Sequence, residues 1–389
     1  MTHATVIGAG SIGVSVAAHL ANRDVDVTIL DRGYAAGETT GKAGGLIFSQ
    51  LHEPSDVRAM DYSIEYFRSL SDDDNHFTFH QTGFLRVGTE AERPVFEHEV
   101  AMQQEAGADV RLVEPDEMRS IYPDLSLDGV TVGTYAPADG YADPHTFTTT
   151  LLADAEADGV DYRPGTSVTD IDPGDSPSVT TDEGTIETDV VAIAAGPWSH
   201  RVASLAGIDL PVKPYRAQAL VTTPVDVDIG TVYDAHEEVY FRREQEGGLL
   251  VGDGTEEVES DPDDYSQRAD FDFLAKMSDT IDHRLSAGEV GVQNAWAGLC
   301  TATPDGHPLV GRPPFEPGGA SRPNGVVVAA GLQGHGFMRS PAVGRAVAAL
   351  LCNDRQTYSD WDPTRFDAHP GDFEIEEMLK LEGKHHHLR

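Results

Sequence analysis

The chain has 389 residues, with 66 acidic against 27 basic side chains and a formal net charge of −39. Such a charge argues against nucleic acid or an anionic membrane as a partner. Acidic groups spread over a whole surface repel one another unless salt screens them, so we hypothesise a protein from a salt-accumulating halophile. The only cysteines are Cys300 and Cys352, which excludes a disulfide framework and a cysteine-ligated iron–sulfur centre in this chain.

No targeting or membrane signal stands out in the pattern. An apolar run begins at Ala4, which leaves no room for a signal peptide. No run approaches the length of a membrane-spanning helix, about 20 residues. We therefore expect a cytoplasmic protein without a membrane span. The charged end at 369–389 contains adjacent histidines at 385–387 and is expected to be a solvated tail, and no cluster of His, Cys and carboxylates suggests a metal.

The first elements form a nucleotide-binding pattern at residues 4–31. An apolar run leads into Gly8, Gly10 and Gly13, a helix-compatible stretch follows, and a second apolar run ends in Asp31, 18 residues after the last glycine. This is the dinucleotide-binding fingerprint in its required context. The glycines predict a tight turn, a close approach of the pyrophosphate and close packing of helix on strand. The N–H groups of the helix start favour phosphate, and Asp31 is placed to accept a ribose hydroxyl.

Two later apolar runs repeat the step from strand to glycine. Residues 190–193 lead to Gly196, and residues 325–330 lead to Gly331 and then to a helix expected at 341–350. Three such transitions at distant points predict one parallel sheet assembled from separated segments. Ligands of such sheets bind at the carboxyl ends of the strands.

The stretch 214–299 differs from the rest, because short runs alternate like strands and only one helix is expected, at 265–281. It predicts a mainly antiparallel second domain inserted into the first. Elsewhere we expect helices at 56–70, 90–106 and 147–158, a strand at 81–88, and short strands near 167–171, 178–182 and 185–188. The expected fold class is α/β, α+β overall.

Seven short motifs in this order resemble the D-amino acid oxidase superfamily of flavoproteins, which includes sarcosine oxidase, glycine oxidase and dye-linked proline dehydrogenase. They lie at 6–13, 42–45, 194–199, 211–214, 296–299, 303–308 and 334–338. The resemblance covers most of the chain. It implies FAD rather than NAD, a choice that the N-terminal fingerprint alone leaves open.

The resemblance implies a segmented, Rossmann-like FAD-binding domain with an inserted substrate domain whose sheet covers the flavin. The FAD-binding domain would comprise 1–78, 143–211 and 301–368, the substrate domain 79–142 and 212–300, and the tail 369–389. Carried over residue by residue, the cofactor-binding positions would be Gly8, Gly10, Ser11, Ile12, Gly13, Asp31, Arg32, Thr40, Lys42, Ala43, Gly44, Gly45, Val168, Ala195, Gly196, Trp198, Gly331, Gly334, His335, Gly336, Phe337 and Met338.

The implied reaction is oxidation of the C–N bond of a small amino acid or N-methyl amino acid. The neutral amine loses a hydride from its α-carbon to flavin N5, and the imine product hydrolyses. The chemistry belongs to the flavin, while the protein positions the substrate and excludes water. The implied partners are a small amine or amino-acid substrate and an electron acceptor, either O2 or another carrier.

Three residues depart from the family pattern. Gly298 stands where monomeric sarcosine oxidases carry the cysteine that binds flavin covalently, so we expect non-covalent FAD. Cys300 stands where glycine oxidase has an arginine that binds the substrate carboxylate, and Met338 where sarcosine oxidase has a lysine with a similar role. Both familiar carboxylate anchors are therefore absent, although a buried carboxylate still needs a cation or several donors.

The remaining candidates for contact with substrate lie on other elements. Arg242 is the first candidate anchor, on an expected strand that also carries Tyr240 on the same face. An exposed arginine paired with an acid would be the ordinary alternative. Lys42 is the next candidate, and Arg339 could turn inward. His335 has a near-neutral ordinary pKa, yet its glycine neighbours favour a role in the cofactor loop over proton transfer.

Two alternative functions stay open on the same fold. One is a 2-hydroxy-acid or glycerol-phosphate oxidoreductase, which would want a further base facing the flavin. The other is the flavin-binding subunit of a larger dehydrogenase complex, so assembly with its own copies or with other chains is also left open. The sarcosine-oxidase lysine linked to oxygen reactivity aligns near Leu250, which favours a dehydrogenase slightly over an oxidase.

Overall fold

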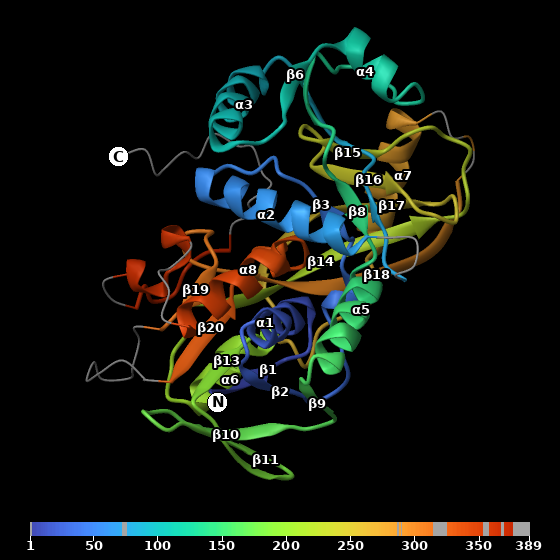
Figure 1. Cartoon of the computed structure of the whole chain (residues 1–389). Helices are drawn as coiled ribbons and strands as arrows, with labels where there is room; N and C mark the ends of the chain where they lie inside the picture. Colours follow the sequence, from blue (N-terminus) through green and yellow to red (C-terminus); the bar gives the residue numbers. More distant parts are fainter. Residues whose placement is uncertain are drawn as a thin grey trace.

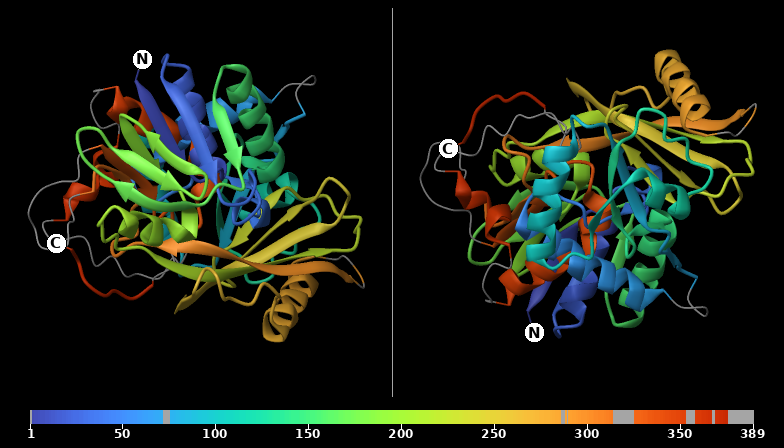
Figure 2. Two further views of the ribbon diagram at one scale, coloured as in Figure 1. Left: turned by 90° about the horizontal axis from the view of Figure 1, so that it is seen from below. Right: turned by 90° about the horizontal axis from the view of Figure 1, so that it is seen from above.

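The computed structural model describes residues 2–71, 76–285, 288, 290–313, 325–352, 358–366 and 369–375. Its two largest sheets have six and eight strands (Figure 1). In Figure 2, left, the long strands of the eight-stranded sheet form one layer, and the six-stranded sheet with its helices lies beside that layer. The chain therefore combines a parallel α/β unit with a mainly antiparallel one, as the sequence predicts.

The six-stranded sheet has the order β19-β20-β13-β1-β2-β9 and is parallel except for β19. Its strands are β1 (His3–Ile7), β2 (Asp26–Asp31), β9 (Asp161–Pro164), β13 (Val190–Ile193), β19 (Leu309–Gly311) and β20 (Val326–Ala330). The strands β1, β13 and β20 are neighbours although almost 200 residues of sequence separate the first two. This confirms a parallel sheet built from distant segments.

Both faces of this sheet are covered, which explains why its central strands are apolar throughout. One face packs against the helices α1 (Ser11–Ala21), α2 (Pro54–Leu70), α5 (Pro144–Ala157) and α8 (Gly336–Leu351). The other face packs against α6 (Ser199–Leu205) and a three-stranded sheet of β10 (Val168–Asp172), β11 (Ser178–Thr181) and β12 (Gly184–Glu187). Neighbouring residues of β1 contribute to opposite cores, Val6 to the first and Ile7 to the second.

The eight-stranded sheet has the order β18-β14-β17-β16-β15-β5-β7-β6, and every pair in it except β15–β5 is antiparallel. Its strands are β5 (Phe84–Gly88), β6 (Arg111–Val113), β7 (Val132–Ala136), β14 (Lys213–Thr222), β15 (Thr231–Asp234), β16 (Val239–Arg243), β17 (Leu249–Glu259) and β18 (Val292–Ala302). The helices α4 (Pro115–Ile121) and α7 (Phe271–Arg284) contribute to the core on one of its faces, and Figure 2, left, shows α7 on the outer side.

Smaller elements connect these layers. The helix α3 (Arg93–Ala106) packs beside α2, and a short sheet joins β3 (Leu46–Ile47), β8 (Gly140–Ala142) and β4 (Phe79–His80). Four short 3-10 helices are η1 (Thr40–Lys42), η2 (Gly196–Trp198), η3 (Ser359–Trp361) and η4 (Pro363–Arg365). Over the described ranges, no helix is long and apolar enough to cross a membrane.

Two helix starts differ from the sequence prediction. The helix α7 begins at Phe271 instead of 265, because the carbonyls of Ser266 and Arg268 accept hydrogen bonds from the Arg216 guanidinium rather than from helical N–H groups. The helix α8 begins at Gly336, with Pro341 inside it instead of at its start. A proline suits the first turn, where N–H groups lack helical acceptors, so the sequence pattern placed the start too late.

The expected tail is not wholly detached. The Lys213 ammonium pairs with Asp372 and donates to the carbonyl of Phe373 at 2.6 Å, and Ile375 is buried in a cluster with Tyr215. Residues 369–375 therefore include contacts with the eight-stranded sheet. Residues 376–389, including the histidines at 385–387, lie outside the described residues.

Candidate cofactor and substrate site

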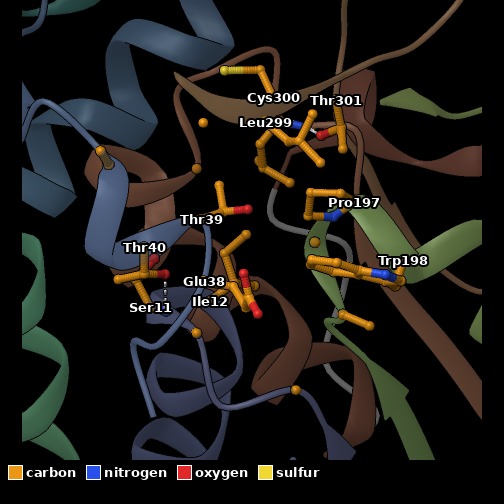
Figure 3. Close-up of a pocket in the computed structure, with 18 of the residues that line it drawn as sticks. Ser11, Ile12, Glu38, Thr39, Thr40, Pro197, Trp198, Leu299, Cys300 and Thr301 are labelled. Carbon is orange, nitrogen blue, oxygen red and sulfur yellow. Dashed lines mark hydrogen bonds between the residues drawn. The ribbon is translucent and has the colours of Figure 1, made fainter. Parts of the chain in front are cut away.

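A cavity of about 810 Å³ lies where β1, β13 and β20 end. The residues that follow these strands, Gly8, Ala194 and Gly331, line it together with residues of β14 and β18. Figure 3 shows Ser11 and Thr40 on one side of the cavity, with Pro197 and Trp198 on the other and residues of β18 above them. The cavity thus lies between the two large sheets, at the position the parallel topology predicts.

The first glycine turn allows backbone to approach backbone closely. Gly8 has φ +109°, and a Cβ built on it would lie 2.5 Å from the carbonyl oxygen of Ala194. A Cβ on Gly13 would lie 1.8 Å from the carbonyl oxygen of Gly8. The Ser11 amide donates to Thr40 Oγ1 at 3.1 Å, which joins the start of α1 to η1. This turn therefore admits only glycine at two positions and presents the N-terminus of α1 to the cavity.

Asp31 fixes the turns after β1 and β2 at the same time. Its Oδ2 accepts from the amide of Ala9 at 2.8 Å, and its Oδ1 accepts from the amide of Gly33 at 2.7 Å. Each carboxylate oxygen has a second acceptor site. Asp31 also lines the cavity, so it retains the capacity to accept a hydroxyl there.

The third glycine turn, after β20, is held against β18. The amide of Gln333 donates to the carbonyl of Thr301 at 2.9 Å, and the amide of Leu332 donates to Thr301 Oγ1 at 3.2 Å. Gly331 and Gly334 have φ of +69° and +76°. The chain then enters α8, whose first residues line the cavity with the positive end of a helix dipole.

The predicted cofactor-binding residues lie together. All of them except Gly13 line this cavity, namely Gly8, Gly10, Ser11, Ile12, Asp31, Arg32, Thr40, Lys42, Ala43, Gly44, Gly45, Val168, Ala195, Gly196, Trp198, Gly331, Gly334, His335, Gly336, Phe337 and Met338. Gly13 instead provides the close contact of α1 with the turn at Gly8.

Of the two strand candidates for substrate contact, only Tyr240 lines the cavity. The Tyr240 hydroxyl packs against Gly252, since a Cβ built on that glycine would lie only 2.3 Å from the hydroxyl oxygen. Arg242 is buried outside the lining, where Nε and Nη2 donate to the carbonyl oxygen of Gly44 at 3.0 and 2.8 Å. Nη2 also pairs with Glu244 at 3.2 Å, and the guanidinium lies over the Tyr141 ring at 4.1 Å. The arginine therefore holds backbone that lines the cavity.

His335 is the only histidine among the described residues that line the cavity. Burial lowers the pKa of His335 well below its usual value, and the charges of Arg339 and His52 lower it further. Its ring meets Phe48 edge-on at 5.5 Å, and Nδ1 has no hydrogen-bond partner within the described structure. The apolar surroundings of His335 therefore favour the neutral ring over its protonated form.

Lys42 extends from η1 toward the loop before α7. Its Nζ donates to the Tyr265 hydroxyl at 2.8 Å and to Gln267 Oε1 at 3.2 Å, and lies 3.7 Å from Glu38. Trp296 Nε1 donates to the Lys42 carbonyl at 2.9 Å. Both ends of this residue therefore contact the antiparallel unit.

Three further side chains belong to the cavity region although the sequence did not point to them, namely Asp263, Arg201 and Tyr265. Asp263 accepts from Trp198 Nε1 at 2.8 Å and pairs with Arg201, and both residues line the cavity. The Trp198 hydrogen bond, followed by the charges of nearby arginines, lowers the pKa of Asp263. The only available signal was an acidic run at 261–264, which is typical of a solvated surface.

Comparison with known proteins identifies the fold and the activity class. The sequence model of the FAD dependent oxidoreductase family, DAO, matches residues 3–350. The chain belongs to this family. It is therefore an FAD-dependent oxidoreductase, which agrees with the resemblance in the motifs.

Three relatives span most of the chain. FAD-dependent oxidoreductase domain-containing protein 1 of Xenopus laevis is 28% identical over 399 residues, 89% of this chain and 78% of its own length. Sarcosine oxidase subunit beta of Arthrobacter sp is 25% identical over 362 residues, 90% of this chain and 86% of its own length. The crystal structure of L-proline dehydrogenase from P. horikoshii is 29% identical with a TM-score of 0.86, covering 94% of this chain and 98% of that one.

The residues of this DAO-family cavity fit FAD. The close-packed turn at Gly8 and Gly10 and the start of α1 would hold the pyrophosphate, and Asp31 would hold the ribose. A Cβ on Gly331 would meet Thr303 Cγ2 at 2.2 Å, so the backbone beneath the opposite end of the cavity is also tightly packed. The start of α8 there favours negative charge.

Proposed function

We propose that this chain oxidises the C–N bond of a small amino acid or N-methyl amino acid. Its relatives include one named for L-proline and one named for sarcosine, both of which are secondary amino acids. When it is bound, FAD accepts the two electrons of such an oxidation as one hydride. The neutral amine would lose that hydride from its α-carbon, and the imine product would then hydrolyse.

The observation that carries this proposal is the placement of His335, which is buried edge-on against Phe48. A hydroxy acid needs a base to take its hydroxyl proton as the hydride leaves, whereas an amine brings its own nitrogen lone pair. Because burial lowers the pKa of His335, and Nδ1 has no hydrogen-bond partner within the described structure to orient the ring, this lining histidine is poorly suited to the first reaction. This favours an amine over a 2-hydroxy acid or a glycerol phosphate.

Tyr240 and Arg242 have different roles in this proposal. Tyr240 lines the cavity, so its hydroxyl is proposed to contact the substrate. Arg242 is proposed as a positioning residue that fixes the Gly44 carbonyl, rather than as the carboxylate anchor that the sequence suggested. Arg242→Lys would then lower turnover by misplacing Gly44. An anchoring role would instead raise the substrate KM greatly and leave kcat nearly unchanged.

The cofactor is proposed to be non-covalent. Gly298 has no side chain at the position where related oxidases carry their linking cysteine, and a Cβ there would lie 3.3 Å from Lys42 Cβ. Acid precipitation of the holoenzyme should therefore release all yellow colour into the supernatant. Colour retained in the pellet would contradict this assignment.

Anaerobic bleaching of the flavin in high salt tests the proposed reaction. Sarcosine, dimethylglycine, glycine, L-proline, D-alanine and 2-hydroxyglutarate are mixed separately with the holoenzyme. We expect bleaching by an amino acid with a small or N-methylated amine. Bleaching by 2-hydroxyglutarate alone would overturn the proposal. Readmission of air then separates an oxidase, which recolours at once, from a dehydrogenase, which needs an added acceptor.

A second candidate is that the chain works as one subunit of a larger enzyme. The name of the Arthrobacter relative describes a subunit, and the alignment spans 86% of that protein. Purification from the native source would then yield further chains in fixed ratio. Full activity of the isolated chain with an artificial dye would count against an obligatory assembly.

A further inference from the structure

The loop between β17 and α7 reaches from the antiparallel unit to the cavity lining. Residues 261–267 of this loop are called the strap here. Asp263 of the strap lines the cavity together with Arg32, Trp198 and Arg201, which come from the parallel unit. The strap is therefore part of the cofactor site, although it lies far in sequence from every glycine turn.

The first anchor of the strap is the Asp263 carboxylate. Its Oδ1 accepts from Trp198 Nε1 at 2.8 Å and from Arg32 at 3.2 Å, while its Oδ2 pairs with Arg201. Arg201 also pairs with Asp261 at 2.7 Å. The Arg32 guanidinium lies 4.3 Å from the centre of the Trp198 ring. One carboxylate thus holds three side chains of the cavity wall in a single arrangement.

The second anchor is formed by Tyr265 and Gln267, which both accept from Lys42 Nζ. Lys42 belongs to η1, and Figure 3 shows Thr40 of η1 on the side of the cavity opposite Trp198. Within the antiparallel unit, Arg216 of β14 donates to the carbonyl of Ser266 in the strap at 2.9 Å, and it pairs with Asp270 beyond the strap at 2.6 Å. Among the described residues, the strap is joined to the parallel unit by the contacts with Lys42 and by those of Asp261 and Asp263.

The ion pairs of the first anchor are exposed enough to open readily. The side chains of Arg32 and Asp263 are 50% and 48% exposed, and that of Arg201 is 40% exposed. Ion pairs of this exposure contribute little singly and weaken with salt. By contrast, the ion pair of Arg339 with Asp56 is buried, with side chains 1% and 2% exposed, and is therefore little screened by salt.

We propose that the strap retains FAD, and that Asp263 is the residue through which it does so. Release of Asp263 frees Trp198, Arg32 and Arg201 together, so the cofactor enters and leaves when this anchor opens. The proposal concerns FAD retention alone and does not depend on the identity of the substrate. It assigns a role in cofactor exchange to a loop of the antiparallel unit.

The test measures FAD loss from the full-length holoenzyme after dilution, followed by the rise in free-flavin fluorescence. Asp263→Ala should accelerate the loss about tenfold, and Asp263→Asn should act less, because an amide oxygen still accepts from Trp198. The matched control is Asp264→Ala, which removes the same charge from a side chain that makes no hydrogen bond or ion pair with the described residues. It should leave the rate unchanged.

A double-mutant comparison separates the strap from a general loss of stability. Arg201→Ala should also accelerate FAD loss, and Asp263→Ala combined with Arg201→Ala should add little to either change alone, because both remove one shared contact. Thermal unfolding of each apoprotein is measured alongside. The proposal is wrong if Asp263→Ala and Asp263→Asn lose FAD at the wild-type rate, or if all variants, Asp264→Ala included, accelerate equally.

Discussion

Gly13 shows that a fingerprint residue can act without touching the ligand. It does not line the cavity, yet a Cβ on it would overlap the carbonyl oxygen of Gly8 at 1.8 Å. It lets α1 approach the turn at Gly8, whose N–H groups are proposed to hold the phosphates of FAD. The sequence predicted both the residue and this role, because the requirement is local and depends on the absence of a single atom.

Gly13→Ala should therefore shift α1 and impair both folding and FAD binding. Overpacking of this kind costs about 1–3 kcal/mol. Thermal unfolding should show the loss, and flavin absorbance per polypeptide should fall. Gly33→Ala is the control, since its Cβ would lie at an ordinary 3.6 Å from Asp31 Oδ1. Full flavin content in Gly13→Ala would show that the turn tolerates displacement of the helix.

Asp139 is a buried carboxyl that should make stability depend on pH. Burial raises its pKa to about 7, although Ser49 donates to Oδ2 through its amide at 3.0 Å and its hydroxyl at 3.3 Å. The folded protein therefore binds a proton at pH values where the unfolded chain has released it. Stability from this group is present below about pH 4 and is lost as pH rises toward 7, by at most ~1.4 kcal/mol per pH unit.

Asp139→Asn isolates this contribution. Between pH 5 and 7, a window chosen from the raised pKa, the wild type should lose stability relative to the variant, and above pH 7 the difference should level off. Urea unfolding in constant high salt at several pH values measures it. Parallel curves for the two proteins across that window would contradict a raised pKa at Asp139.

Asp263 marks the limit of sequence reasoning for single residues. It belongs to the acidic run 261–264 in a chain with 66 acidic residues, so nothing local distinguishes it from surface charge. Its importance arises from Trp198 and Arg201, which the fold brings to it from more than 60 positions away. Glycine turns can be predicted from the local sequence, whereas the side chains that Asp263 contacts are brought to it only by the tertiary structure.

At the scale of elements, one carboxylate joins α2, α8 and η3. Asp56 Oδ2 accepts from Arg339 Nη2 at 2.9 Å, and Asp56 Oδ1 accepts from Trp361 Nε1 at 2.8 Å, with all three residues buried. Arg339 does not line the cavity, so the sequence expectation that it could turn toward substrate gives way to a proposed structural role. The helix α8, which follows the third glycine turn, is thus held by buried contacts outside the cavity.

Asp56→Ala would leave the Arg339 guanidinium buried without its partner. Loss of one member of a buried pair costs about 3–5 kcal/mol, which should appear as a large drop in the urea midpoint. The matched control is Asp116→Ala, which breaks a pair with Arg119 whose side chains are 100% and 59% exposed. That change should stay within about 0.5 kcal/mol. Similar losses of stability in both variants would contradict the proposed structural role of the buried Asp56–Arg339 pair.

The sequence predicted which segments form helices or strands better than it predicted where these elements begin. Apolar runs placed β1, β13 and β20 correctly, because strands buried on both faces are apolar throughout. The start of α7 was not predictable, because Arg216, on the distant strand β14, donates hydrogen bonds to two carbonyls of the loop that precedes α7. The start of α8 was obscured by Pro341, a residue that sequence rules associate with a first turn.

For the whole molecule, the net charge of −39 should set the response to salt. Repulsion among exposed carboxylates weakens as the Debye length falls to roughly 3 Å at 1 M salt. The melting temperature should therefore rise between low and multimolar KCl. Sucrose at equal osmolality is the control, because it stabilises by exclusion without screening charge. A melting temperature that stays constant or falls in KCl would refute the halophile hypothesis.

The order of strands also constrains how the protein is made. The cavity needs β1 and β13 from the first half of the chain, and it needs the turn at 331–338 from close to its end. A ribosome must therefore translate more than 330 residues before a complete FAD site exists. Until that turn has been made, FAD has no complete site to stabilise, so the glycine turn after β1 must persist without its ligand up to that point. Cellular supply of the flavin should thus act only after β20 and the turn that follows it have been translated.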